Sequence, residues 1–103
     1  MNSVYNVDEI RDRLRPVFIT KPVYKAILFG SYAKGIATEN SDIDIVIDSK
    51  GELRGLRFYG VLDDMVEALD KSIDLIDISE IRPGAPIMDD ILRQGVILYE
   101  RQG

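Results

Sequence analysis

Short apolar runs alternate with amphipathic stretches along this chain, and this alternation limits the available folds more than any other feature. Four runs have the length and composition of strands, with the last either a strand or an extended tail: residues 24–29 (YKAILF), 42–47 (DIDIVI), 73–78 (IDLIDI) and 96–99 (VILY). Helical patterns separate them at residues 7–19, 56–71 and 87–94. The alternation favours an α/β (α+β) domain with a mixed sheet of three to four strands flanked by helices.

The helical segments each show one apolar stripe. In residues 7–19 the stripe is Ile10, Leu14 and Val17, and Pro16 is expected to kink or end this helix. In residues 56–71 the stripe is Leu62, Met65, Val66 and Leu69. Gly95 is expected to cap the helix at residues 87–94. A chain of 103 residues builds one modest core, so we expect a single domain over residues 1–103.

The composition excludes several kinds of chemistry. The sequence has no cysteine and no histidine, so disulfides, zinc–thiolate sites, Ser-His-Asp triads and histidine metal ligands are excluded. A bound metal would have oxygen ligands, which favours Mg²⁺ or Mn²⁺. The net charge of −5 argues against direct nucleic-acid binding, which needs a basic surface. The sequence lacks a signal-peptide pattern and a membrane-length apolar run, so we expect a cytoplasmic location.

The segment from Gly30 to Asp44 (GSYAKGIATENSDID) carries the residues suited to chemistry. A predicted strand ends at Phe29, and Gly30 allows the backbone to turn and to approach a ligand closely. Ser31 begins a short helix or turn over residues 31–37. Free backbone N–H groups at such a turn favour phosphate, to which Ser31 Oγ can add a hydrogen bond.

After a polar loop at residues 38–41, the chain enters a strand that presents Asp42 and Asp44 on one face. Two residues apart on a strand, their Cα atoms are roughly 6.5–7 Å apart. Both side chains can converge on one divalent ion, which would relieve their mutual repulsion. The segment therefore combines a phosphate-holding turn with acidic ligands for the ion that accompanies a nucleoside triphosphate.

A third acidic residue is expected in the next strand, IDLIDI. Asp74 alternates with Ile76, whereas Asp77 shares the opposite face with Ile73 and Leu75, which are expected to face the core. We therefore prefer Asp74 and keep Asp77 as the competing candidate. If this strand lies beside the first aspartate strand, an acid near its start completes a three-carboxylate site.

Each part of this pattern is weak alone. Strand aspartates are commonly solvated, and turns commonly carry Gly and Ser. Together, at this spacing and on a strand–turn–helix pattern, they favour one functional site. A P-loop is excluded because GSYAKG lacks the required Gly-Lys-Ser/Thr. Asp48, at the end of its predicted strand, is expected to stabilise a turn. The tyrosines show no stacking pattern and are expected in packing and surface positions: Tyr5, Tyr24, Tyr32, Tyr59 and Tyr99.

Gly30-Ser31, ten intervening residues and Asp42-Ile43-Asp44 resemble the signature of the DNA polymerase β-like nucleotidyltransferase superfamily. More closely, ILFGSYAKGIATENSDIDIVID, a helix and IDLID are similar to the minimal nucleotidyltransferases, which are single catalytic domains. This resemblance extends over about residues 24–99. It implies that Asp42, Asp44 and Asp74 bind Mg²⁺ (or Mn²⁺) and carry catalysis.

The same resemblance implies nucleotide-binding residues. ATP is the implied substrate, and the residues implied to bind it are Gly30, Ser31, Lys34 and Ser41. The family often has arginine at the position of Lys34. Lysine keeps the positive charge there but loses the two-pronged contact that arginine makes with phosphate.

The resemblance finally implies a partner and a reaction. Minimal nucleotidyltransferases work beside a helical HEPN-domain ribonuclease toxin and act as type VII-like antitoxins by transferring AMP from ATP to a toxin tyrosine. Two alternatives stay open. In the first alternative, the chain is a non-catalytic antitoxin that occludes its partner through residues 56–71 or the segment from Ile87. In the second, it is a nucleotidyltransferase that modifies a small molecule or an RNA end.

Overall fold

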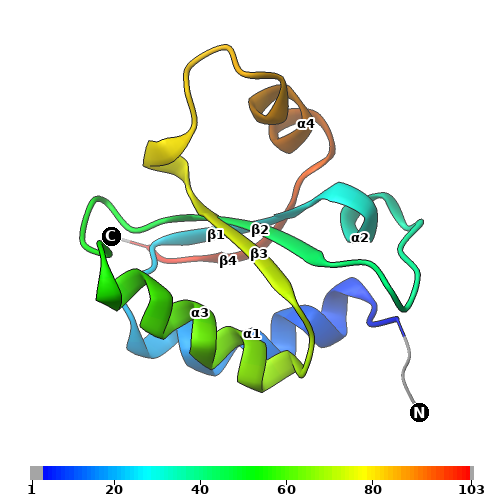
Figure 1. The fold of residues 1–103 in the computed structure, drawn as a ribbon, viewed down its shortest axis with the longest axis horizontal. Coiled ribbons are helices and arrows are strands. Elements are labelled where there is room, and N and C mark those ends of the chain that lie inside the picture. The colour runs from blue at the N-terminus through cyan, green and yellow to red at the C-terminus, as the bar shows by residue number, and fades with distance from the viewer. Residues whose placement is uncertain (1–3, 103) are drawn as a thin grey trace.

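The computed structural model describes residues 4–102 of the chain. Its elements follow in order: α1 (Val7–Thr20), β1 (Lys25–Phe29), α2 (Gly30–Lys34), β2 (Ile43–Asp48), α3 (Leu56–Leu69), β3 (Ile73–Asp77), the 3₁₀ turn η1 (Ile78–Glu80), α4 (Pro86–Gln94) and β4 (Val96–Glu100). The predicted α/β architecture with a mixed sheet is confirmed, and the last apolar run is a strand (Figure 1). Within residues 4–102, no helix has the length and apolar character needed to cross a membrane.

The four strands form one sheet in the order β3-β2-β1-β4. β1 is antiparallel to both β2 and β4, whereas β2 and β3 run parallel. Helices α1 and α3 cover one face of this sheet, α4 lies over the other, and α2 lies at one end of the strands (Figure 1). Because β2 and β3 run in the same direction, their first residues meet at one end of the sheet, where Asp44 is the Cα partner of Asp74.

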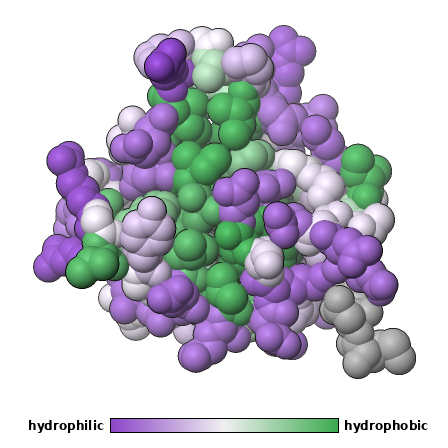
Figure 2. Space-filling model, in the orientation of Figure 1, coloured by the Kyte–Doolittle hydropathy of each residue, from purple (hydrophilic) through white to green (hydrophobic). Residues whose placement is uncertain are grey.

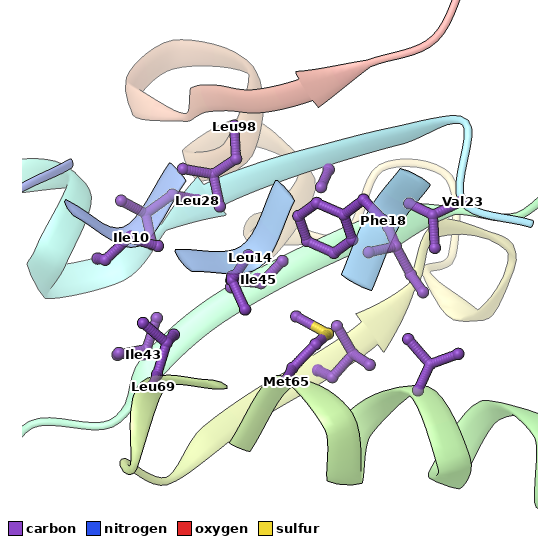
Figure 3. Packing of buried hydrophobic residues seen from close by; sticks show 14 of the residues in the cluster. Ile10, Leu14, Phe18, Val23, Leu28, Ile43, Ile45, Met65, Leu69 and Leu98 are labelled. Atoms are coloured by element: carbon purple, nitrogen blue, oxygen red, sulfur yellow. The ribbon is translucent and has the colours of Figure 1, made fainter. Parts of the chain in front are cut away.

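The larger core lies between the sheet and the helix pair α1 and α3 (Figure 3). α1 buries Ile10, Leu14 and Phe18 at i, i+4, i+8 spacing. Val17 of the predicted stripe is partly buried and packs against the same cluster, so the stripe is confirmed and Phe18 is its most buried C-terminal member. α3 buries Val61, Met65 and Leu69, again at this spacing. Burying one such side chain contributes about 1.5–3 kcal/mol before the entropy cost of ordering the chain.

A smaller cluster lies on the opposite face and holds α4 to the sheet. Phe29, Val46 and Ile91 are buried in it. Partly buried isoleucines surround them: Ile27, Ile76, Ile78, Ile81 and Ile87. Figure 2 shows apolar side chains in a strip that begins beneath α4 and continues across the sheet. The cluster under α4 is therefore smaller than the core under α1 and α3.

Gly95 ends α4 as predicted, and its N–H donates to Ile91 O over 2.9 Å. The left-handed conformation typical of such caps is absent, because Gly95 has φ −66°. A Cβ at this position would lie 2.3 Å from Ile91 O and 2.7 Å from Ile27 Cγ2. Glycine is therefore needed here for close packing of α4 against β1 rather than for a special turn.

Several helix and strand boundaries differ from those predicted from the sequence. α1 continues to Thr20, four residues beyond Pro16, so this proline does not end the helix. α2 spans Gly30–Lys34 rather than residues 31–37, because Gly35 adopts a left-handed φ of 75° and stops it. β3 ends at Asp77, where the carboxylate accepts the backbone N–H of Ser79 and starts the 3₁₀ turn.

Candidate active site

The turn from β1 into α2 is built against the carboxylate of Asp44. Gly30 has φ +71°, and a Cβ on it would lie only 2.1 Å from Asp44 Oδ2. Phe29, the residue before it, is the Cα partner of Asp44 in the β1–β2 ladder, which explains the close approach. Glycine is thus required here both for the left-handed φ and for the space that the carboxylate takes.

The short helix α2 follows this turn directly. Its first turn carries backbone N–H groups that have no acceptor inside the helix, and Ser31, half-buried, stands among them. Ile36 N donates to Ser31 O over 3.1 Å and closes the last turn of α2. The predicted turn is therefore present beside Asp44, and its role toward phosphate stays a prediction.

Three aspartates meet at the start of the parallel strands. Asp42 immediately precedes β2, Asp44 is its second residue, and Asp74 lies directly across from Asp44 on β3. Asp42 and Asp74 are exposed, whereas Asp44 is half-buried under the Gly30 turn. The parallel pairing therefore brings together the three acids that the sequence pattern selected.

Asp44 bears the repulsion among these acids. Burial raises the pKa of the Asp44 carboxyl above its ordinary value, and the negative charges of Asp74, Asp42 and Asp90 raise this pKa further. Such a group favours a cation beside it, because a cation removes the repulsion and restores the charged form.

Asp90 is a fourth acid at this site, and sequence analysis missed it. It lies on α4, and its Oδ1 forms an ion pair with Lys34 Nζ at 3.2 Å. Nothing in the local pattern separates Asp90 from the neighbouring Asp89. Only the packing of α4 beside α2 shows which of the two acids faces the site.

Asp77, the competing third acid, lies in the core. Its side chain is 6 % exposed and accepts a hydrogen bond from Ser49 Oγ at 2.7 Å. Ser79 N and Ser79 Oγ donate to its other oxygen at 3.0 and 2.8 Å. These contacts give Asp77 a structural role at the end of β3, away from the acids at the strand starts.

Two other predicted polar residues stabilise loops. Ser41 Oγ accepts the backbone N–H of Thr38 at 2.9 Å and closes the loop that leads into β2. Its role toward a nucleotide stays a prediction. Asp48 lies at the far end of β2 and accepts the N–H of Lys50 at 2.9 Å, which is the expected turn role.

The donor set fits a hard divalent cation. The candidates are carboxylate oxygens, which Mg²⁺ and Mn²⁺ prefer, and among the described residues no lysine or arginine forms an ion pair with Asp44. In the part of the chain that the structure describes, no three acidic side chains already converge as a metal-binding group. Ion binding therefore requires side-chain rotation, which the exposure of Asp42 and Asp74 permits.

Comparison with known proteins gives a family match over most of the chain. Residues 12–103 match the family described as polymerase beta, nucleotidyltransferase. A Methanocaldococcus jannaschii protein assigned as a protein adenylyltransferase is 31 % identical over 91 residues, which are 88 % of this chain and 96 % of that protein. The protein adenylyltransferase MntA of Shewanella oneidensis is 32 % identical over 76 residues, which cover 73 % of this chain and 52 % of MntA.

A solved structure shares the fold. A toxin–antitoxin crystal structure with AMP-PNP contains a chain that superposes with a TM-score of 0.70 at 27 % identity. The match covers 95 % of this chain and 76 % of the other. The fold built from α1 to β4 is therefore that of a small nucleotidyltransferase domain.

Proposed function

This chain belongs to the polymerase β nucleotidyltransferase family, and from that membership we propose that it transfers AMP from ATP to a protein hydroxyl. The acceptor that we propose is a tyrosine of a HEPN-domain ribonuclease toxin, which makes the chain an antitoxin. We also propose that residues 1–103 act as one minimal nucleotidyltransferase domain.

One observation carries the proposal: the carboxylate of Asp44 lies against the Gly30 turn, with Asp74 across from it. A triphosphate on the turn would thus be held beside the residues that suit its divalent ion. The relatives support the reaction class, because both are named as protein adenylyltransferases. The structural neighbour, a toxin–antitoxin complex with an ATP analogue, supports the nucleotide and the kind of partner.

Each residue has a defined role in the proposed reaction. The backbone N–H groups after Gly30 and the hydroxyl of Ser31 hold the triphosphate, with Lys34 and Ser41 as further nucleotide contacts. Asp42 and Asp44 hold Mg²⁺ (or Mn²⁺), which when bound neutralises charge on the phosphates. Asp74, across from Asp44 on β3, completes the metal-binding set and favours loss of the proton from the acceptor hydroxyl.

The reaction is a phosphoryl-type substitution. The acceptor oxygen forms a bond to the α-phosphorus of ATP, and the bond from that phosphorus to the β-phosphate oxygen breaks. Pyrophosphate leaves, and the acceptor hydroxyl loses its proton. Asp74, exposed at the start of β3, is placed to accept that proton or to favour its loss through its negative charge.

The test is transfer of label. The chain is incubated with Mg²⁺, labelled ATP and a HEPN-domain partner, and the partner is weighed by mass spectrometry. We expect a mass gain of one or more AMP units that is lost in Asp44→Asn. Asp63→Asn is the matched control, because Asp63 is an exposed acid on α3, which covers the face of the sheet away from α4.

Two outcomes would overturn the proposal. Full transfer of AMP by the Asp44→Asn variant would show that this site does not carry out the reaction. Absence of transfer with a partner that is still bound and silenced would show that the chain acts by occlusion. Transfer of AMP to a small molecule or to an RNA end, and not to protein, would keep the chemistry and change the acceptor.

A further inference from the structure

Lys34 is the last residue of α2, the short helix that begins at the Gly30 turn. The Asp44 carboxylate lies against Gly30. The long, flexible side chain of Lys34 is therefore anchored one turn away from the acid at the centre of the site.

Asp90 holds the Lys34 ammonium in another direction. The Lys34 Nζ–Asp90 Oδ1 distance is 3.2 Å, and about a third of each side chain is exposed, at 35 % and 30 %. Within residues 4–102, the pair with Asp90 is the ion pair that Lys34 forms. In the same part of the chain, no lysine or arginine forms an ion pair with Asp44. The Lys34 ammonium is thus engaged by α4 and not by the proposed metal-binding residues.

Packing of α4 on the sheet holds Asp90 in position for this contact. Its Ile91 is buried in the smaller core cluster, one residue after Asp90. At its end, Gly95 allows the helix to pack within van der Waals contact of Ile27 on β1. The backbone under Asp90 is therefore supported by packing that does not involve the ion pair.

We propose that Asp90 is a positioning residue that keeps the Lys34 ammonium away from Asp44, so that Asp42 and Asp44 stay open to a divalent ion. Without Asp90, the freed Lys34 ammonium would be attracted by the Asp44 carboxylate and would compete with the ion. The inference rests on the proposed function, because it takes Asp42 and Asp44 as the metal-binding residues.

The experiment measures Mn²⁺ binding to the nucleotide-free chain by the EPR signal of free Mn²⁺. Asp90→Asn should weaken Mn²⁺ binding by about two- to fivefold, the size expected for one partly exposed ion pair. Asp90→Glu should restore it. Asp89→Asn is the matched control, because it removes an exposed acid next to Asp90 on the same helix, and it should leave binding unchanged.

Loss of the Asp90 charge would weaken cation binding slightly by itself, so the decisive variant is the double mutant. Lys34→Gln should change Mn²⁺ affinity little in the wild-type chain and should restore it in the Asp90→Asn chain. An equal effect of Lys34→Gln in both backgrounds would overturn the inference, because the charges would then act independently. Asp90→Gln replaces Asp90→Asn if the latter lowers the melting temperature.

Asp44→Asn separates the two proposals. If it abolishes Mn²⁺ binding while the Lys34 and Asp90 effects are additive, the inference about Asp90 fails and the metal-binding site stands. If Asp44→Asn binds Mn²⁺ as tightly as the wild type, the ion lies elsewhere, and the inference fails together with the proposed site.

Discussion

The Oδ2 atom of Asp44 fills the space that a side chain on Gly30 would need, with an ideal Cβ only 2.1 Å away. Two residues that are 14 positions apart in sequence are thus fitted to each other through the pairing of Phe29 with Asp44. A phosphate-holding turn and an acidic residue are close because one strand ladder joins them. The relationship explains why glycine, and no other residue, suits the first position of the Gly-Ser pair.

Gly30→Ala should therefore displace the Asp44 side chain. The left-handed φ alone costs about 1–2 kcal/mol for a residue with a Cβ. The matched control is Gly35→Ala, which has φ +75° but nothing within 4 Å of the new Cβ. We expect both variants to lower the free energy of unfolding in urea, and only Gly30→Ala to abolish AMP transfer. Equal transfer by both variants would contradict the close fit.

We expect Asp74 to be required for AMP transfer and Asp77 to be required for the stability of the fold. Asp77→Asn changes a buried acceptor of three hydrogen bonds, which should cost about 1–3 kcal/mol of stability. Asp74→Asn removes an exposed charge, so its melting temperature should be unchanged or slightly higher while AMP transfer is lost. Thermal unfolding and transfer assays on both variants test this, and normal transfer by Asp74→Asn would restore Asp77 as the third acid.

The raised pKa of Asp44 predicts a specific pH dependence in metal-free buffer. Above the raised pKa, Asp44 is ionised in both the folded and unfolded states, and the folded state bears the whole penalty of burial and of repulsion by Asp74, Asp42 and Asp90. As the pH falls through the raised pKa, folded Asp44 binds a proton before the unfolded chain does, and the penalty disappears.

Asp44→Asn should therefore melt at a higher temperature than the wild type at neutral pH. This difference should shrink as the pH falls toward 3.8, the ordinary value for an Asp carboxyl. Added Mg²⁺ should raise the melting temperature of the wild type only. A difference that grows as the pH falls would show that the Asp44 charge stabilises the fold.

Tyr32 offers a test of the core beneath α2. Its side chain is 5 % exposed, and its hydroxyl is buried without a hydrogen-bond partner among the described residues. Tyr32→Phe should leave stability unchanged or increase it by about 1 kcal/mol, because a buried unpaired hydroxyl is costly. Tyr5→Phe is the control and should destabilise the fold by a similar amount, because Tyr5 Oη donates to Leu69 O at 2.7 Å. Chemical denaturation measures both.

Local periodicity predicted the type of each main element, because hydrophobic spacing and turn residues act within a few positions. Local periodicity was less accurate where contacts between distant segments decide which residue is buried or which residue type is required. Phe18, which the predicted stripe omits, is fully buried in the core, whereas Val17 packs at its margin and is only partly buried. Gly95 was expected as a cap, and the structure shows that closeness to Ile27 on another element requires glycine there.

The sequence by itself determined the alternation of strands and helices, the family signature and the acids on the outward positions of β2. These features depend on neighbours in the chain, which the order of residues specifies directly. Only the tertiary structure decided that Asp74 lies across from Asp44, that Asp77 is buried against Ser49, and that Asp90 reaches Lys34. Those contacts join distant segments, and the packing of β3 and α4 on the sheet brings them together.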